Sequence, residues 1–219
     1  MGFAVLILGA SGTGKSTSLR NFKKGEIGVL NVGKKPLPFR GKLDVANTAD
    51  YELIEKTLMK NTYNAYAIDD SQFLMVYENF AHAYEKGYDK FTKMAVNFQE
   101  LLNVIINGTS NDTIVYLLHH IDFDDMGRAK AKTIGKMLDQ QLPIESAVPI
   151  TLLTQTDSEK YTFITNGLPP AKSPLGMFED KEIENDLRMV DETIRAYWEL
   201  APLRNVNDKP AAKAKEAKE

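Results

Sequence analysis

The sequence predicts a three-layer α/β fold: a mainly parallel central sheet, helices on both faces, and an antiparallel hairpin towards the C-terminus. Short apolar runs alternate with amphipathic stretches over the first two hundred residues, which is the pattern of a β/α domain. The runs at 3–8, 65–68 and 113–118 are apolar at nearly every position, as in strands buried on both faces. A glycine-rich loop directly after the first run is the third observation that supports this fold.

Composition sets the domain organisation. The 219 residues suffice for one well-buried domain, and 43% hydrophobic with 26% charged residues is typical of a globular protein. We expect a single domain over residues 1–204 and a flexible charged tail over 205–219, which has almost nothing to bury. The absence of cysteine excludes disulfides and a cysteine nucleophile, and it fits a cytoplasmic protein. With a net charge of −3, any polyanion site must be a local patch.

The apolar run at 3–8 also bears on membranes. It is far shorter than the roughly 20 residues that span a bilayer, and no basic segment precedes it. We therefore predict a buried strand there rather than a signal peptide, and we expect no membrane partner.

The elements follow in order from hydrophobic periodicity. The predicted strands cover residues 3–8, 27–32, 65–68, 113–118, 148–154 and 161–165, and the last two form a hairpin around Asp157 and Ser158. The predicted helices cover residues 15–22, 51–59, 71–86 and 89–107, with a last one marked by Leu187, Val190 and Ile194. Residues 121–136 are polar, charged and interrupted by glycine, which predicts a surface loop.

The strongest functional signal is a complete phosphate-binding loop. It reads Gly9-Ala10-Ser11-Gly12-Thr13-Gly14-Lys15-Ser16-Thr17, which fits G-x-x-x-x-G-K-[ST] between a strand and a helix. The glycines let backbone N–H groups turn inward around a polyphosphate, and the following helix adds the positive end of its dipole. Lys15 is predicted to reach the β and γ phosphates of ATP, and Ser16 to offer its hydroxyl to Mg²⁺.

Two carboxylates end the strand at 65–68. Asp69 takes the position that holds Mg²⁺ beside the Ser or Thr of the loop. Asp70 either polarises the attacking water as a general base or caps the helix that follows, and both roles are compatible.

A histidine pair and a basic loop follow the strand at 113–118. His119 and His120 lie at the edge where ligands bind in open α/β sheets, so one of them is expected to contact the γ-phosphate or the water. The loop at 121–136 offers cations and an aromatic side chain to single-stranded nucleic acid, although three aspartates in the same loop favour a merely solvated loop. The candidates for DNA contacts are Phe123, Arg128, Lys130, Lys132 and Lys136.

Taken with the late segment at 173–178, these motifs resemble a group of small phage ATP-binding proteins. Those proteins look like minimal RecA-type recombinase cores of the P-loop NTPase class, and some act as single-strand annealing proteins in phage recombination. The resemblance covers roughly residues 1–200 and rests on the phosphate loop, the Asp69-Asp70 pair, the His119-His120 strand end, and Pro174-Leu175-Gly176-Met177-Phe178.

The resemblance implies roles for matching residues. It places nucleotide contacts on 12–17, the metal carboxylate on Asp69, the phosphate sensor on His119 or His120, and the DNA-contacting loop on 121–136. It also implies a homo-oligomer, a single-strand-binding protein as partner, and a cation supplied by the next subunit. The candidates for that cation are Arg128, Lys132, Lys136, Arg188 and Arg195.

This chain departs from the RecA pattern at one position. RecA-type cores carry a catalytic glutamate just after the second strand, where this sequence reads Asn31-Val32-Gly33-Lys34-Lys35. Hydrolysis must therefore use Asp70, be slow, or depend on a neighbouring subunit. We expect a Mg²⁺-dependent ATPase that couples nucleotide state to single-stranded DNA binding or annealing. The alternatives are a small nucleoside or nucleotide kinase, and a DNA-binding module that ATP switches without hydrolysis.

Overall fold

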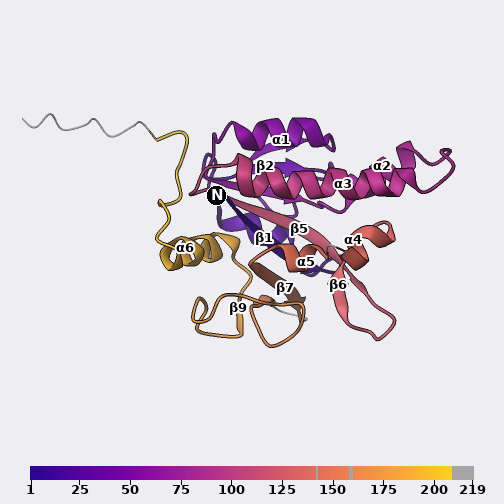
Figure 1. Cartoon of the computed structure of the whole chain (residues 1–219). Coiled ribbons are helices and arrows are strands. Elements are labelled where there is room, and N and C mark those ends of the chain that lie inside the picture. The colour runs from indigo at the N-terminus through magenta and orange to yellow at the C-terminus, as the bar shows by residue number, and fades with distance from the viewer. Residues whose placement is uncertain (142, 158–159, 209–219) are drawn as a thin grey trace, which may run out of the picture.

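The apolar runs predicted as strands form the centre of one mixed sheet (Figure 1). The computed structural model describes residues 1–141, 143–157 and 160–208, with the side chain of Lys136 also outside the described part. The strands are β1 Phe3–Gly9, β2 Gly28–Asn31, β3 Asp44–Asn47, β4 Ala65–Asp69, β5 Ile114–Phe123, β6 Ala129–Ala131, β7 Ile150–Thr156, β8 Tyr161–Ile164 and β9 Glu182–Glu184.

The sheet order is β3-β2-β4-β5-β1-β7-β8-β9, with β6 paired to the far end of β5. Strands β3 to β7 in this order run parallel, while β8 and β9 add antiparallel to β7. The prediction of an α/β fold with a mainly parallel sheet and a late antiparallel hairpin is confirmed. The short strands β3, β6 and β9 were not predicted, because three or four residues with charged side chains carry no readable period.

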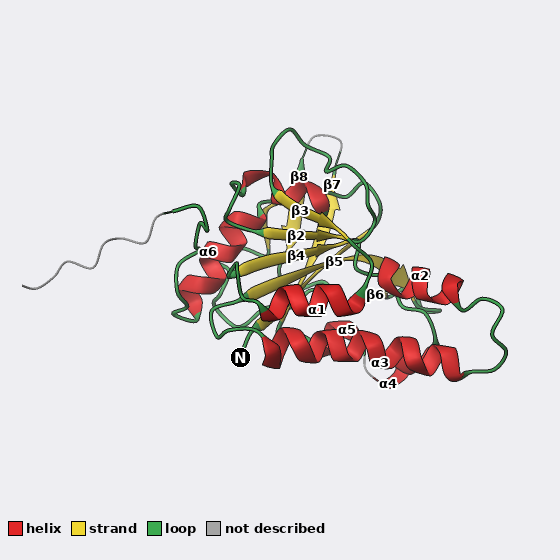
Figure 2. Cartoon of the chain, turned by 90° about the horizontal axis from the view of Figure 1, so that it is seen from above, coloured by secondary structure: helices red, strands yellow, loops and turns green. Residues whose placement is uncertain are grey.

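Helices lie on both faces of this sheet. They are η1 Ser16–Asn21, α1 Tyr51–Met59, α2 Phe73–Ala81, α3 Asp89–Asn103, η2 Val104–Gly108, α4 Lys136–Gln141, α5 Ile144–Ala147 and α6 Leu187–Tyr197. Figure 1 shows α1, α2 and α3 at the top of the molecule and α6 at its left side, and Figure 2 shows α1 and α3 side by side. The predicted helix at 71–86 is shorter than expected, since α2 ends at Ala81, and the predicted helix at 89–107 finishes as the π-helix η2.

Each face of the sheet buries its own hydrophobic cluster. On one face, Ile54 and Leu58 of α1 and Phe98 of α3 pack against the sheet. On the other face, Leu19 of η1 and Val190 of α6 do so. Continuous apolar strands supply side chains to both clusters in alternation, which is why their sequences show no polar positions. The sheet is thereby fixed on both sides, and the loops at its carboxyl edge are held by a rigid support.

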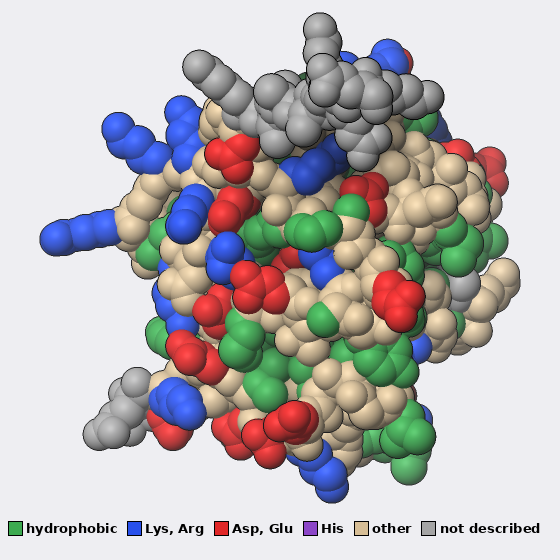
Figure 3. All heavy atoms as spheres, turned by 90° about the vertical axis from the view of Figure 1, so that its left-hand side faces the viewer, with side chains coloured by type: hydrophobic (Ala, Val, Ile, Leu, Met, Phe, Trp, Pro, Cys, Tyr) green, Lys and Arg blue, Asp and Glu red, His purple; other side chains and the backbone are tan. Residues whose placement is uncertain are grey.

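The C-terminal boundary differs from the expected one. The predicted tail begins at Asn205, but the Val206 N–H donates to the Gly25 carbonyl at 2.9 Å, so residues 205–208 lie against the domain. Residues 209–219 of the predicted tail fall outside the described part of the chain. On the face that carries α6, acidic and basic side chains are intermixed (Figure 3).

Candidate nucleotide site

The phosphate loop leaves the end of β1 and closes around its own lysine. The Lys15 Nζ donates to the carbonyls of Gly9 and Ala10, each at 2.8 Å. Gly12 and Gly14 take φ values of 82° and 98°, which glycine adopts without strain. Burial lowers the pKa of Lys15 to about 8, although Asp70 and Asp69 act to raise it. The loop thus holds a buried cation beside its own carbonyl oxygens.

The remaining loop residues are placed as the motif predicts. Ser11, Gly12, Gly14, Lys15, Ser16 and Thr17 all line one cavity of about 270 Å³, which we call the nucleotide cavity. The Thr13 hydroxyl donates to the Ala10 carbonyl at 2.8 Å and therefore braces the loop from outside the cavity. Tyr161 of β8 also lines the cavity, and the sequence analysis missed it because β8 is distant in sequence.

The segment after the loop is not the α-helix that was predicted. Residues 16–21 form the 3₁₀ helix η1, in which Ser18 N–H donates to both Gly14 and Lys15 carbonyls. A helix of six residues has a smaller dipole than a full α-helix, so the loop's own N–H groups and Lys15 carry more of the expected phosphate binding.

Ser16 and Asp69 come together as the sequence predicts. The Ser16 Oγ–H donates to Asp69 Oδ1 at 2.8 Å, across 53 positions of chain. Burial raises the pKa of Asp69, against the hydrogen bond from Ser16. Carboxylate and hydroxyl oxygens are the ligands that Mg²⁺ accepts, together with waters and substrate phosphates. Among the described residues, no group of three or more His, Cys, Asp or Glu side chains is arranged to hold a metal ion.

Strand order brings the second carboxylate to the same edge. Strand β5 pairs with β1 on one side and with β4 on the other, so the end of β5 lies between the phosphate loop and Asp70. In this register Gly9 is opposite His120 and Asp69 is opposite Leu118. Parallel strands share their carboxyl edge, and this is where α/β sheets bind ligands.

Asp70 is held in a left-handed conformation with φ of 58°. Its carboxylate accepts from Lys35 Nζ at 2.9 Å and lies 3.3 Å from His120 Nε2. Burial alone acts to raise the pKa of Asp70, but the hydrogen bonds from His120 and Lys35 outweigh it and bring this pKa down to about 2. The Asp70 side chain does not cap the following helix, because the N-cap of α2 is Gln72 and no side chain caps its N-terminus.

The two histidines separate into one buried and one facing the cavity. His119 is fully buried, its Nε2–H donates to the Lys132 carbonyl at 2.7 Å, and its Nδ1 accepts from the Ser71 hydroxyl at 2.9 Å. Burial lowers the pKa of His119 to about 4, so it is neutral at physiological pH. With both ring nitrogens engaged, His119 is wrong as a phosphate sensor. His120 lines the nucleotide cavity and contacts Asp70, so it alone keeps that prediction.

Lys35 is the residue that the sequence analysis did not place. It belongs to the stretch 31–35 after β2 in which no carboxylate occurs, and besides contacting Asp70 its Nζ lies 4.9 Å from the centre of the Phe73 ring. Lys34, with φ of 54°, turns the chain after β2 and brings Lys35 back towards the sheet edge. Gly33 packs against the same carboxylate, because a Cβ there would come within 2.5 Å of Asp70 Oδ2. Lys35, Pro36 and Pro38 line one side of the nucleotide cavity.

The predicted surface loop at 121–136 is wrong in its structure. Strand β5 continues to Phe123 and pairs with β6, making a hairpin over residues 121–131, and α4 starts at Lys136. Side chains alternate between the two faces of this hairpin, but the charged residues on both strands conceal the alternation in the sequence. Arg128 Nε pairs with Asp124 at 2.7 Å, and Lys130 Nζ pairs with Asp139 at 2.8 Å. Phe123 is 60% exposed and Lys132 is exposed.

The candidates for a cation supplied to a second subunit differ in burial and in ion pairing. Arg195 is buried against Asp191 and donates to the Asn64 carbonyl at 2.6 Å, so it is a structural residue and wrong as an intersubunit cation. Arg188 pairs with Glu26 at 3.1 Å and Glu192 at 2.8 Å. The side chain of Lys136 lies outside the described part of the structure.

In comparisons with known proteins, no protein-family model and no curated protein matches the chain. Among the described residues, no helix combines the length and the apolar character that crossing a membrane requires.

Proposed function

We propose that the protein binds ATP with Mg²⁺ and hydrolyses it at the nucleotide cavity. One observation carries this proposal: the Ser16–Asp69 hydrogen bond of 2.8 Å beside a lysine buried in the phosphate loop. These three side chains are the ones that a phosphate loop uses for a metal–triphosphate complex. Mg²⁺ would be held there by Ser16 and Asp69 and would neutralise phosphate charge.

The chain's own residues have distinct tasks in this proposal. Lys15 exchanges its two carbonyl partners for the β and γ phosphates, and Ser16 with Asp69 orients the metal. Asp70 stays ionised at every physiological pH, because its pKa is about 2. Such a carboxylate is a weak proton acceptor, so its role is to orient and polarise the attacking water. His120 lies beside it and is the group placed to contact the γ-phosphate.

The expected coupling to single-stranded DNA has support from the position of the hairpin. The hairpin at 121–131 begins one residue after His120, so a movement of His120 on nucleotide binding would reach it through one continuous strand. Two of its cations are already paired with aspartates, which weakens the case for the hairpin as the main phosphate contact.

A second candidate function is a nucleoside or nucleotide kinase. One observation favours it: a larger cavity of about 760 Å³ adjoins the nucleotide cavity and shares Lys35 and Pro36 with it. A phosphoryl acceptor in that space would lie next to the phosphate loop. A panel of nucleosides and nucleoside monophosphates, assayed for new phosphorylated product, separates transfer to an acceptor from transfer to water.

The decisive experiment measures ATP binding and phosphate release with Lys15→Ala and, as a matched control, Lys60→Ala on the exposed end of α1. Loss of the only loop cation should cost about 2–3 kcal/mol, some 30- to 150-fold in ATP affinity. The control should bind ATP like the parent protein. A folded Lys15→Ala variant with parental affinity would show that the loop does not hold the triphosphate.

A further inference from the structure

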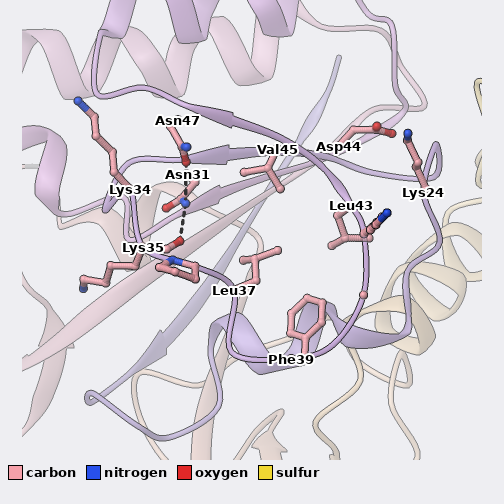
Figure 4. A pocket seen from close by; sticks show the side chains of 13 residues that line it. Lys24, Asn31, Lys34, Lys35, Leu37, Phe39, Leu43, Asp44, Val45 and Asn47 are labelled. Atoms are coloured by element: carbon pink, nitrogen blue, oxygen red, sulfur yellow. Dashed lines mark hydrogen bonds between the residues drawn. The ribbon is translucent and has the colours of Figure 1, made fainter.

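The cavity of about 760 Å³ beside the nucleotide cavity is lined by a basic segment that the proposed ATPase does not use. We call residues 33–43 the Lys35 segment, and the cavity lies between it and the edge strand β3 (Figure 4). Four lysines line the cavity, against the single acidic residue Asp44, whose carboxylate accepts from the Gly25 N–H at 2.8 Å. These lysines are Lys24, Lys34, Lys35 and Lys42.

Most of these cations have no acidic partner. Lys24, Lys34 and Lys42 are exposed, and none of them makes an ion pair within the described part of the chain. Only Lys35 is paired, and its partner is Asp70 of the nucleotide cavity. The local charge is therefore strongly positive on a protein whose net charge is −3. An unpaired cation can neutralise a phosphate at no cost in broken ion pairs.

The arrangement of the lining suits a strand more than a small anion. Figure 4 shows Lys34 and Lys35 at one end of the cavity and Lys24 at the other. Apolar side chains lie between the two ends, namely Leu37, Phe39, Leu43 and Val45. Two separated cationic ends with an apolar, partly aromatic centre fit successive backbone phosphates with a base between them. A mononucleotide would carry phosphate at one end only.

The floor of the cavity is built from fixed amides. The Asn31 Nδ2 group is buried and donates to Asn47 Oδ1 at 2.9 Å and to the Lys35 carbonyl at 2.7 Å. This bond ties the backbone of the Lys35 segment to the end of β2. The segment is thus held at the sheet edge, and Lys35 reaches from one cavity to the other.

We propose that this cavity binds the phosphate backbone of single-stranded nucleic acid, and that Lys35 transmits its occupancy to Asp70. When a strand occupies the cavity, a backbone phosphate competes with Asp70 for the Lys35 ammonium. Asp70 then keeps only its contact with His120 and is freer to orient water. Strand binding therefore accelerates hydrolysis. The second half of this inference rests on the proposed ATPase, while strand binding itself does not.

Strand binding is tested by the fluorescence anisotropy of a labelled oligo-dT at several salt concentrations, without nucleotide. The variant is Lys24→Gln with Lys34→Gln and Lys42→Gln, and the control is Lys60→Gln with Lys86→Gln and Lys93→Gln, which removes equal charge from exposed positions elsewhere. Three lost phosphate contacts should flatten the log–log salt slope by about 2 units and weaken binding about 100-fold at 0.1 M salt. The control should keep the parental slope.

Four outcomes overturn the strand site. Equal losses in both triple variants would mean that only overall charge matters, and an unchanged slope in the first variant would place the strand on another surface. Displacement of the strand by stoichiometric thymidine monophosphate would assign the cavity to a small phosphorylated acceptor, in favour of the kinase. Failure of the parent protein to bind oligo-dT at any salt concentration would also refute the site.

Coupling is tested by ATP hydrolysis with and without oligo-dT. The parent protein should be stimulated by the strand, Lys35→Gln should hydrolyse faster than the parent without DNA and no longer respond, and Lys35→Arg should restore the response because it can again pair with Asp70. A normal response in Lys35→Gln refutes the role of Lys35. Absence of hydrolysis in the parent would remove the ATPase proposal, while the anisotropy result would stand by itself.

Discussion

The hairpin at 121–131 follows His120, which lines the nucleotide cavity, and the Lys35 segment at 33–43 contributes Lys35 to the same lining. Both regions contain lysine and arginine. In the hairpin, Arg128 and Lys130 are matched to Asp124 and Asp139 at 2.7 and 2.8 Å. In the segment, Lys34 and Lys42 have no ion pair among the described residues, and Lys35 is paired with Asp70 of the nucleotide cavity. The hairpin carries two basic residues and three aspartates, whereas the segment carries four basic residues and no acidic one, so the two regions present different charge to a ligand. Local pairing, which depends on folded geometry, separates a solvated surface from a polyanion site.

The two regions also contact Asp70, at the carboxyl edge of the sheet, through different residues. The segment touches Asp70 through Lys35, and the hairpin touches it through His120 at its root. Asp70 is thus the common neighbour of both regions. Changing it should have the largest effect of any test of this comparison.

We expect Asp70→Asn to slow hydrolysis by about 100-fold or more while ATP stays bound, because the water loses its orienting carboxylate. The same change should abolish stimulation by single-stranded DNA, since Lys35 loses its partner. Single-turnover phosphate release and ATP binding are measured separately. Asp69→Asn is the matched control, and it should instead weaken Mg²⁺-dependent ATP binding. Parental hydrolysis in Asp70→Asn would mean that another residue orients the water.

The second test removes the ion pairs of the hairpin, so that its cations become unpaired like Lys34 and Lys42 of the Lys35 segment. Asp124→Asn with Asp139→Asn releases Arg128 and Lys130 from their ion pairs. If pairing is what keeps the hairpin from binding phosphates, the salt slope for oligo-dT should steepen by about 1.4 units, with affinity rising about 25-fold at 0.1 M salt. The control, Asp122→Asn with Asp125→Asn, changes net charge equally without breaking an ion pair. Equal gains in both variants would contradict the role of pairing.

The third test concerns the buried cation between the two regions. Free Lys15 has a pKa of about 8, and bound phosphates require its charged form. Above that pH the free protein loses this proton, so ATP binding must take one up and affinity falls as pH rises. Below it, affinity should be flat. The expected fall approaches tenfold for each pH unit above about 8. Titrations with a fluorescent nucleotide between pH 7 and 9.5 measure it, and an equally steep fall in Lys15→Ala would assign the effect to another group.

The sequence sufficed for the centre of the fold and for the core of the site. Strands β1, β4 and β5 were predictable because continuous apolar runs have few alternatives, whereas phosphate binding by residues 9–17 stays a prediction from the spacing of the loop. The pairing of Ser16 with Asp69 followed from the shared carboxyl edge of parallel strands. These inferences depend on local sequence patterns, which do not change with the details of side-chain packing.

Other features depended on contacts that no local pattern carries. The role of Lys35 required knowing that β2 lies beside β4, and Tyr161 reaches the cavity from a strand that joins the sheet on the other side of β1. The hairpin was mistaken for a loop because β6 is three residues long and Ala131 is its one buried residue, so the sequence offers no readable alternation. His119 and His120 were indistinguishable in sequence, since which of two neighbours turns inward is decided by the register of β5.

That register has a consequence for the insertions and deletions the chain can tolerate. Adjacent positions on a strand face opposite sides, so one added residue between Ile114 and His119 would exchange the buried and the cavity-facing position. The buried histidine that joins Ser71 to Lys132 would be replaced by a leucine, and His119 would move to the position from which His120 contacts Asp70. Two added residues would restore the alternation but move the hairpin outward by one strand repeat. In an insertion scan, this stretch of β5 should therefore respond to whether the inserted length is odd or even.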